Sequence, residues 1–116
     1  AADGTAGIAF DCYHWYTSGA NEKDLKLMEL MADRLVCLHV NDAVAGRSME
    51  QQKDMERNLP METGMIDSRD ILQRFQRRGA NALYMIEPFE PSRSHFAKMT
   101  AEEAVNEAGK VMDRLK

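Results

Sequence analysis

The sequence predicts an α/β fold in which three consecutive β/α units build a parallel sheet. Three short apolar runs, over residues 7–12, 35–40 and 82–86, have the length of buried strands. Each run is followed by a polar stretch and then by a segment with apolar residues at the helical period. Strands that alternate with helices favour a parallel sheet with right-handed crossovers.

The first two units differ in their loops. After the strand 7–12, a loop through Thr17-Ser18-Gly19 leads to a helix expected over residues 22–33. After the strand 35–40, the loop runs from about residue 41 to residue 65. A loop of that length in a compact domain is usually functional, partly helical or disordered.

The remaining helices carry recognisable end signals. Asp67-Ser68-Arg69-Asp70 caps the second helix, its apolar face is expected at Ile71, Leu72 and Phe75, and Gly79 ends it. The third strand, 82–86, ends in Glu87-Pro88. Thr100-Ala101-Glu102-Glu103 is a capping box that opens a last helix to about residue 115.

Composition limits the partners and the location. With 116 residues, 44% hydrophobic content, a net charge of −4 and no run of like charges, a small molecule fits better than nucleic acid or an anionic membrane. There is no apolar run of membrane-spanning length, so cytoplasm is the expected location. Cys12 and Cys37 are expected to be reduced core residues, and the small, polar start at residues 1–6 is consistent with a truncated end.

Strand parity brings three polar side chains together. Alternate residues of a strand share a face, so one face of the sheet is expected to pack on helices while the other carries Asp11, His39 and Glu87. The helix-facing set is Ile8, Phe10, Cys12, Val36, Leu38, Val40, Tyr84 and Ile86. The opposite set is Gly7, Ala9, Asp11, Leu35, Cys37, His39, Leu83, Met85 and Glu87.

Asp11, His39 and Glu87 also share one level, at the carboxyl ends of the strands, where ligands bind in parallel α/β folds. Two carboxylates and an imidazole that converge suit a divalent cation such as Mn²⁺, Mg²⁺, Co²⁺ or Zn²⁺. The alternative is that three unrelated strand-end residues each form local hydrogen bonds.

Four segments stand out along the chain: Asp11-Cys12-Tyr13-His14-Trp15-Tyr16, Leu38-His39-Val40-Asn41-Asp42, residues 57–67 and Ile86-Glu87-Pro88-Phe89. They resemble successive motifs of the sugar phosphate isomerase/epimerase family of xylose isomerase-like TIM barrels, in the order of its last three barrel units. The resemblance spans nearly the whole chain. It implies that residues 1–116 are the C-terminal units of a barrel, a partial (β/α)₈ barrel, since a complete one takes about 250 residues.

The resemblance also implies roles for single residues. Asp11, His39 and Glu87 match the metal ligands, and Glu87 matches a catalytic acid/base that moves the proton alpha to a carbonyl of a sugar or sugar phosphate. His14 matches a contact to a substrate hydroxyl, and Arg57 an arginine that binds sugar oxygens. For His14 the alternative is a packed, hydrogen-bonded histidine, and for Arg57 a solvated role in a charged loop.

Two departures from the family pattern bear on activity. A further metal-binding glutamate of the family lies on the strand before residues 7–12, and that strand is absent from this sequence. Met61 stands where relatives have glycine, so an altered loop near Arg57 is expected. With one carboxylate of the proton-transfer pair missing, we expect weak or absent turnover by this chain, which is then best described as a fragment.

A bare sheet face gives a second interpretation. Leu35, Cys37, Leu83 and Met85 would be exposed on three isolated strands, which favours completion by self-association or by the missing barrel half. A non-catalytic, self-assembling module that retains the metal ligands is therefore an alternative. The DNA-repair endonuclease branch is a third, because residues 39–42 also resemble its motif, but it needs more histidines than His14, His39 and His95.

Overall fold

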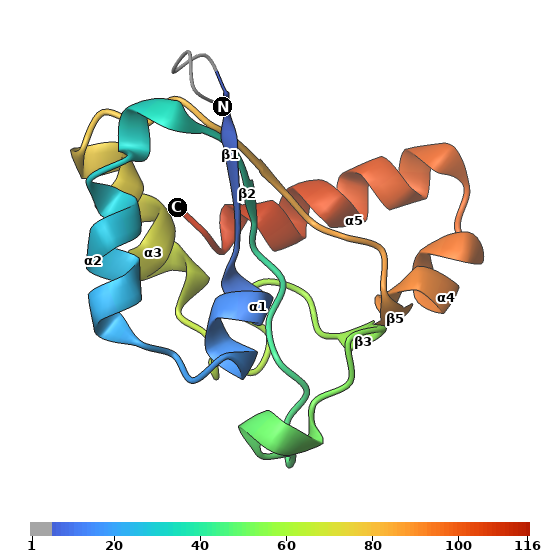
Figure 1. Cartoon of the computed structure of the whole chain (residues 1–116). Coiled ribbons are helices and arrows are strands. Elements are labelled where there is room, and N and C mark those ends of the chain that lie inside the picture. The colour runs from blue at the N-terminus through green and yellow to red at the C-terminus, as the bar shows by residue number, and fades with distance from the viewer. Residues whose placement is uncertain (1–5) are drawn as a thin grey trace.

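The computed structural model describes residues 6–116, so the expectation of a truncated end at residues 1–6 lies almost wholly outside it. The described chain begins with a strand and ends with a long helix, and the first two strands cross in front of that helix in the view of Figure 1. The elements are β1 (Ile8–Asp11), α1 (Cys12–Thr17), α2 (Glu22–Glu29), η1 (Ala32–Arg34), β2 (Leu35–His39), η2 (Met49–Gln51), β3 (Glu56–Arg57), α3 (Ser68–Arg77), β4 (Leu83–Met85), β5 (Glu90–Pro91), α4 (Ser92–Ala97) and α5 (Ala101–Asp113).

The central sheet is parallel, in the order β1-β2-β4, which confirms the predicted arrangement of three β/α units. Asp11 is paired with His39, and His39 is paired with Met85 on the next strand. This register places the ends of the strands at one level. Within residues 6–116 the sheet does not close on itself, as expected of a partial (β/α)₈ barrel.

The core lies between the sheet and the helices. Phe10 of β1 and Leu38 of β2 point toward α2 and α3, and the ring of Phe10 lies 5.4 Å from that of Phe75. The predicted apolar face of α3, with Ile71, Leu72 and Phe75, is buried, and so are Leu25 of α2, Val111 of α5 and Leu115 just beyond α5. Burial of these side chains against the strands supplies the main driving force for the fold.

The predicted parity is wrong at the start of β2. Ile8 pairs with Leu35 but Ala9 pairs with Cys37, so Val36 is an extra residue at a bulge. The bulge turns Leu35 into the core, where it is 6% exposed, and turns Val36 outward, where it is 57% exposed. Beyond the bulge, the parity predicted for Leu38, His39 and Val40 agrees with the structure.

Several short elements were not predicted. The helix expected over residues 22–33 stops at Glu29 and is followed by the separate turn η1. The long loop is ordered into η2 and β3, and β3 pairs in parallel with β5. The short helix α1 follows β1 directly at the carboxyl end of the central sheet, and the β3–β5 pair with α4 lies to one side of it (Figure 1).

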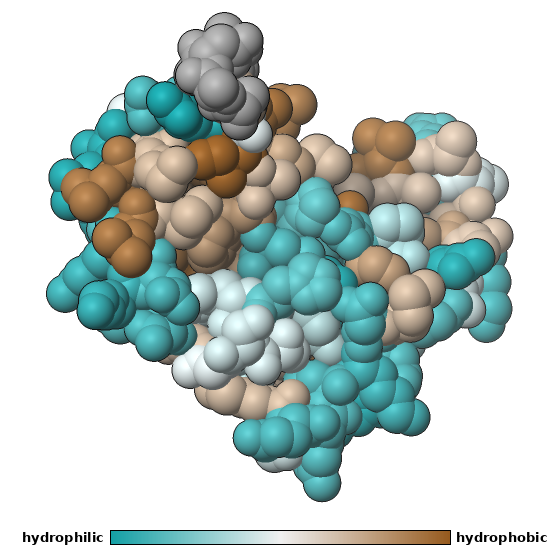
Figure 2. All heavy atoms as spheres, viewed as in Figure 1, coloured by the Kyte–Doolittle hydropathy of each residue, from teal (hydrophilic) through white to brown (hydrophobic). Residues whose placement is uncertain are grey.

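The face of the sheet opposite the core is apolar and open. Leu83, 71% exposed, lies on it with Met85, and the Cys37 thiol contacts the Met85 sulfur at 3.5 Å. Figure 2 shows apolar surface where the strands and α2 lie in Figure 1. Both cysteines are free, but only Cys12 is in the core. No helix among the described residues is long and apolar enough to span a membrane.

Candidate metal centre

Asp11 uses its two carboxylate oxygens in different ways. It is the N-cap of α1, and Oδ1 accepts hydrogen bonds from the backbone N–H groups of Tyr13, at 2.9 Å, and His14, at 3.1 Å. Oδ2 faces the centre of the site. Burial opposes ionisation of Asp11, but the His14 N–H and the Arg57 guanidinium outweigh it and lower the pKa of Asp11 below its usual value.

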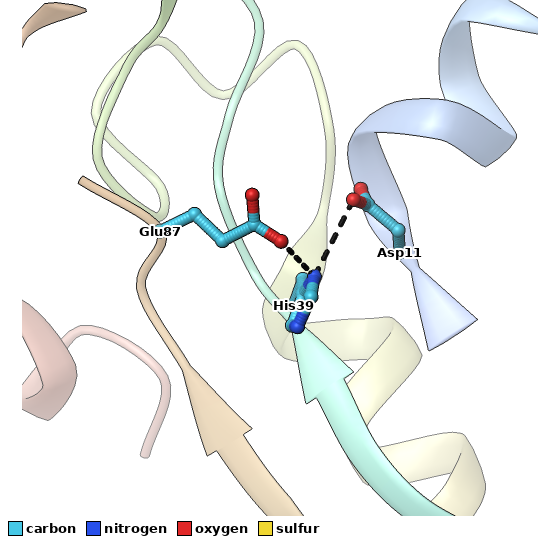
Figure 3. A group of neighbouring side chains, drawn as sticks. All are labelled: Asp11, His39 and Glu87. Atoms are coloured by element: carbon cyan, nitrogen blue, oxygen red, sulfur yellow. Dashed lines mark ion pairs between the residues drawn. The ribbon is translucent and has the colours of Figure 1, made fainter. Parts of the chain in front are cut away.

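His39 stands between the two carboxylates. Its Nδ1 lies 3.5 Å from Asp11 Oδ2 and is in contact with Glu87 Oε1 (Figure 3). Asp11 ends β1, His39 ends β2, and Glu87 follows the end of β4 by two residues. The matched ends of three neighbouring parallel strands therefore bring together side chains that are 28 and 48 residues apart in the sequence.

These three side chains fit a divalent cation. One ligand atom from each lies within 4.8 Å of the other two, close to the spacing of about 3–4 Å between ligands that each bind an ion at about 2.0–2.2 Å. An imidazole nitrogen with two carboxylate oxygens is a donor set typical of Mn²⁺, Co²⁺ and Zn²⁺, and the carboxylates also suit Mg²⁺. Three protein ligands leave positions for a substrate.

Asn41 and Asp42 fix the backbone around the site through side-chain hydrogen bonds. The Asn41 side chain, fully buried, accepts a hydrogen bond from the Glu87 N–H and donates one to the Glu87 carbonyl. The Asp42 carboxylate accepts four backbone N–H groups, from Ala43, Thr63, Gly64 and Ile66, and its backbone pairs with Asn58. Sequence reasoning gave these two residues no role, although their place directly after His39 and Val40 was the available signal.

Arg57 reaches the centre of the site. The alternative prediction, that Arg57 is a solvated residue of a charged loop, is wrong. The residue is 1% exposed, and its guanidinium carbon lies 4.3 Å from the ring centres of both Tyr13 and Phe89. Nη1 donates to Asp11 Oδ2 at 2.9 Å. Contact with a substrate stays a prediction for Arg57, because here its hydrogen-bonding groups are directed at protein acceptors.

His14 lies at the rim of the centre. Its side chain is 57% exposed, so it is not a packed core histidine. Arg57 Nη2 lies 3.2 Å from His14 Nε2, and since arginine only donates, this nitrogen accepts. The imidazole is therefore accessible beside the three candidate ligands, and its contact with a substrate hydroxyl stays a prediction.

The loop that carries Arg57 adopts a conformation suited to glycine at one point. Met61 has φ of 60°, in the left-handed region that favours glycine, and the altered loop expected from this substitution stays a prediction. This conformation costs a non-glycine residue about 1–2 kcal/mol. Met61 packs against the core, and this contact offsets part of the cost.

Comparison with known proteins agrees with the geometry. The family model described as Xylose isomerase-like TIM barrel matches residues 3–115. Searches of curated proteins and of solved structures gave no match. The matched region includes the whole parallel sheet and all three candidate ligands at its carboxyl edge. The chain therefore belongs to the xylose isomerase-like TIM barrel family.

Proposed function

We propose that this chain carries the metal-binding edge of a divalent-metal-dependent isomerase or epimerase of a sugar or sugar phosphate. The observation that carries the proposal is the convergence of Asp11, His39 and Glu87 at the carboxyl ends of three parallel strands. Family membership supports the same general chemistry. The reaction class is proton transfer at the carbon alpha to a carbonyl.

Each residue has a separate task in this proposal. A bound divalent ion would polarise the substrate carbonyl and so acidify the neighbouring C–H bond. Glu87 is the base that takes this proton, because Asp11 has its oxygens engaged by the α1 N–H groups and by Arg57. His14, exposed at the rim, contacts a substrate hydroxyl and sets its orientation.

Slow turnover follows from the same assignment. Epimerisation requires a group that returns the proton to the opposite face of the same carbon, and isomerisation requires return of the proton to the neighbouring carbon. Glu87 is the one carboxylate among the described residues to which we assign proton transfer. A proton that Glu87 returns to the same face of the same carbon regenerates the substrate. We therefore expect exchange of the alpha proton with solvent to be faster than net conversion.

The test incubates a panel of ketoses and ketose phosphates in D₂O with the chain and MnCl₂. NMR then measures how much deuterium each sugar has incorporated at the carbon alpha to its carbonyl. Exchange that depends on Mn²⁺ and is lost in Glu87→Gln supports the proposal. A Glu102→Gln variant, changed at an exposed position of α5, serves as a matched control that keeps exchange. If Mn²⁺ binds but no sugar exchanges its alpha proton, the proposed proton transfer is wrong.

A non-catalytic, self-assembling module is the second candidate. The observation that favours it is the open apolar face with Leu83 and Met85, which a second copy would remove from water. The ligands would then bind an ion that stabilises the assembly without chemistry. Metal-dependent oligomers with no proton exchange would support this candidate over the first.

The endonuclease branch finds less support in the arrangement. A three-metal cluster needs several ligand groups, and within residues 6–116 one group of three candidate ligands comes together. Of the remaining histidines, His14 lies at the rim and His95 lies on α4.

A further inference from the structure

We propose that Arg57 is a positioning residue that serves as the internal cation of the metal-free centre and holds Asp11 and Glu87 near ligand spacing until an ion binds. The inference rests on the proposed metal site and assigns this residue a task other than contact with the substrate. It concerns how the centre stays assembled when it is empty.

The guanidinium is fixed on every side. Its faces are covered by the rings of Tyr13 and Phe89, each 4.3 Å from the central carbon. Its Nε donates to the Asp54 carbonyl at 3.1 Å, and Nη2 donates to the Asp54 side chain at 3.0 Å. A buried, doubly stacked and anchored arginine keeps its position without help from an ion.

The remaining nitrogen of the guanidinium, Nη1, points at the candidate ligands Asp11 and Glu87. Nη1 lies 2.9 Å from Asp11 Oδ2 and 3.8 Å from Glu87 Oε2, so one nitrogen faces both carboxylates. Without a cation, two carboxylates that converge on His39 would repel each other. Arg57 offsets this repulsion and thereby keeps the strand ends together.

Other nearby cations are engaged elsewhere. Arg47 and Lys53, in the same loop, both pair with Glu56. Among the described residues, Arg57 is the one lysine or arginine within 4.0 Å of the Asp11 or Glu87 carboxylates. The charge balance of the empty centre therefore depends on this side chain.

An ion and Arg57 would share an oxygen. Asp11 Oδ2, which accepts from Arg57, is also the Asp11 oxygen that lies 3.5 Å from His39 Nδ1. A bound dication would take over part of the counter-charge that Arg57 supplies. Loss of Arg57 should consequently matter more to the metal-free protein than to the metal-loaded one.

The experiment compares melting temperatures of the 116-residue chain in EDTA and in saturating MnCl₂. Arg57→Met keeps a long apolar side chain between the two rings but removes the charge. We expect its Tm to lie below the wild-type Tm in EDTA, and the gap to shrink by about 4 °C or more in Mn²⁺. Arg69→Met, an exposed arginine on α3, is the matched control and should leave both values unchanged.

Arg57→Lys is the conservative variant. It keeps the positive charge without the planar fork, so it should restore part of the lost Tm in EDTA. If Arg57→Met folds only with Mn²⁺, the proposal holds. If Arg57→Met folds in neither condition, the Tm difference between wild type and Arg57→Lys is compared in EDTA and in Mn²⁺ instead. A difference that shrinks in Mn²⁺ supports the proposal, and equal differences overturn it.

Two failures are distinguishable. Equal gaps in EDTA and Mn²⁺ would show that Arg57 supports the fold alone, and would overturn this inference while leaving the metal site intact. A wild-type protein that gains no stability from Mn²⁺ would instead overturn the metal site, and with it the function proposed above.

Discussion

Asn41 and Glu87 are joined by a pair of hydrogen bonds that continues the sheet beyond the end of its strands. Asn41 Oδ1 accepts from the Glu87 N–H at 2.8 Å, and Asn41 Nδ2 donates to the Glu87 carbonyl at 3.0 Å. The amide side chain thus takes the place of a neighbouring strand. It fixes the backbone of Glu87 and so the direction in which the carboxylate points.

Replacement of Asn41 should loosen the metal centre. In Asn41→Ala the Glu87 backbone loses both partners, so we expect Mn²⁺ affinity to fall by about 10–100-fold and stability by about 1–3 kcal/mol. Calorimetric titration and urea unfolding measure the two effects. Asn106→Ala, exposed on α5, is the matched control. Unchanged affinity in Asn41→Ala would show that Glu87 does not depend on this pair.

Asp42 should be needed for the loop that carries Arg57. Its fully buried carboxylate accepts four backbone N–H groups, and Asp42→Asn replaces one accepting oxygen by a donor. We expect a loss of about 2–3 kcal/mol in the free energy of unfolding, measured by urea denaturation. Asp33→Asn, exposed in η1, should change little. Equal midpoints for the two variants would contradict the assignment.

Arg74 should tie α2 to α3. It pairs with Glu22, Glu29 and Asp70, and the bond to Glu29 is partly buried. Arg74→Met should cost about 1 kcal/mol at neutral pH, whereas Arg77→Met, exposed on the same helix, should cost almost nothing.

The pH dependence of the Arg74 effect has a definite sign. The hydrogen bond to Arg74 lowers the pKa of Glu22 below its usual value of 4.5. The stabilisation is therefore present above pH 4.5 and is lost as the pH falls through the lower pKa of the folded protein. The difference in thermal stability between wild type and Arg74→Met should narrow as the pH falls below 4.5. A difference that does not narrow below pH 4.5 would contradict the pairing.

The open face of the sheet should drive association. We expect the mass in solution to rise with concentration, because Leu83 and Met85 would leave water when two copies meet. Leu83→Lys should shift the distribution toward the monomer in sedimentation experiments. Gln73→Lys, on the outer face of α3, adds the same charge elsewhere and should not. A wild-type monomer at all concentrations would rule out self-association through this face.

Much of the fold could be predicted because it depends on local patterns. The apolar runs around Phe10, Leu38 and Tyr84 are separated by well-capped helices, and such patterns indicate both the elements and a parallel sheet. The bulge at Val36 could not be predicted, since both Leu35 and Val36 are apolar and only packing against Phe75 and its neighbours decides which is buried.

The candidate ligands could also be predicted from the sequence, because their placement depends on the local alternation of residues along each strand. Asp11 and His39 are paired beyond the bulge, and Glu87 lies two residues after Met85, the partner of His39, so simple alternation places all three on one face. The burial of Arg57 was not predictable, because it depends on Tyr13 and Phe89, which lie 44 residues before it and 32 residues after it. Contacts between distant loops leave no periodic signal in the sequence.

Stoichiometric Mn²⁺ binding tests the central claim most directly. Isothermal titration of the metal-free chain with MnCl₂ should give one saturable site per chain, weakened by about tenfold or more in His39→Gln. His95→Gln, an exposed histidine on α4, should bind as wild type does. Absence of saturable binding, or equal binding by the two histidine variants, would contradict a metal centre at Asp11, His39 and Glu87.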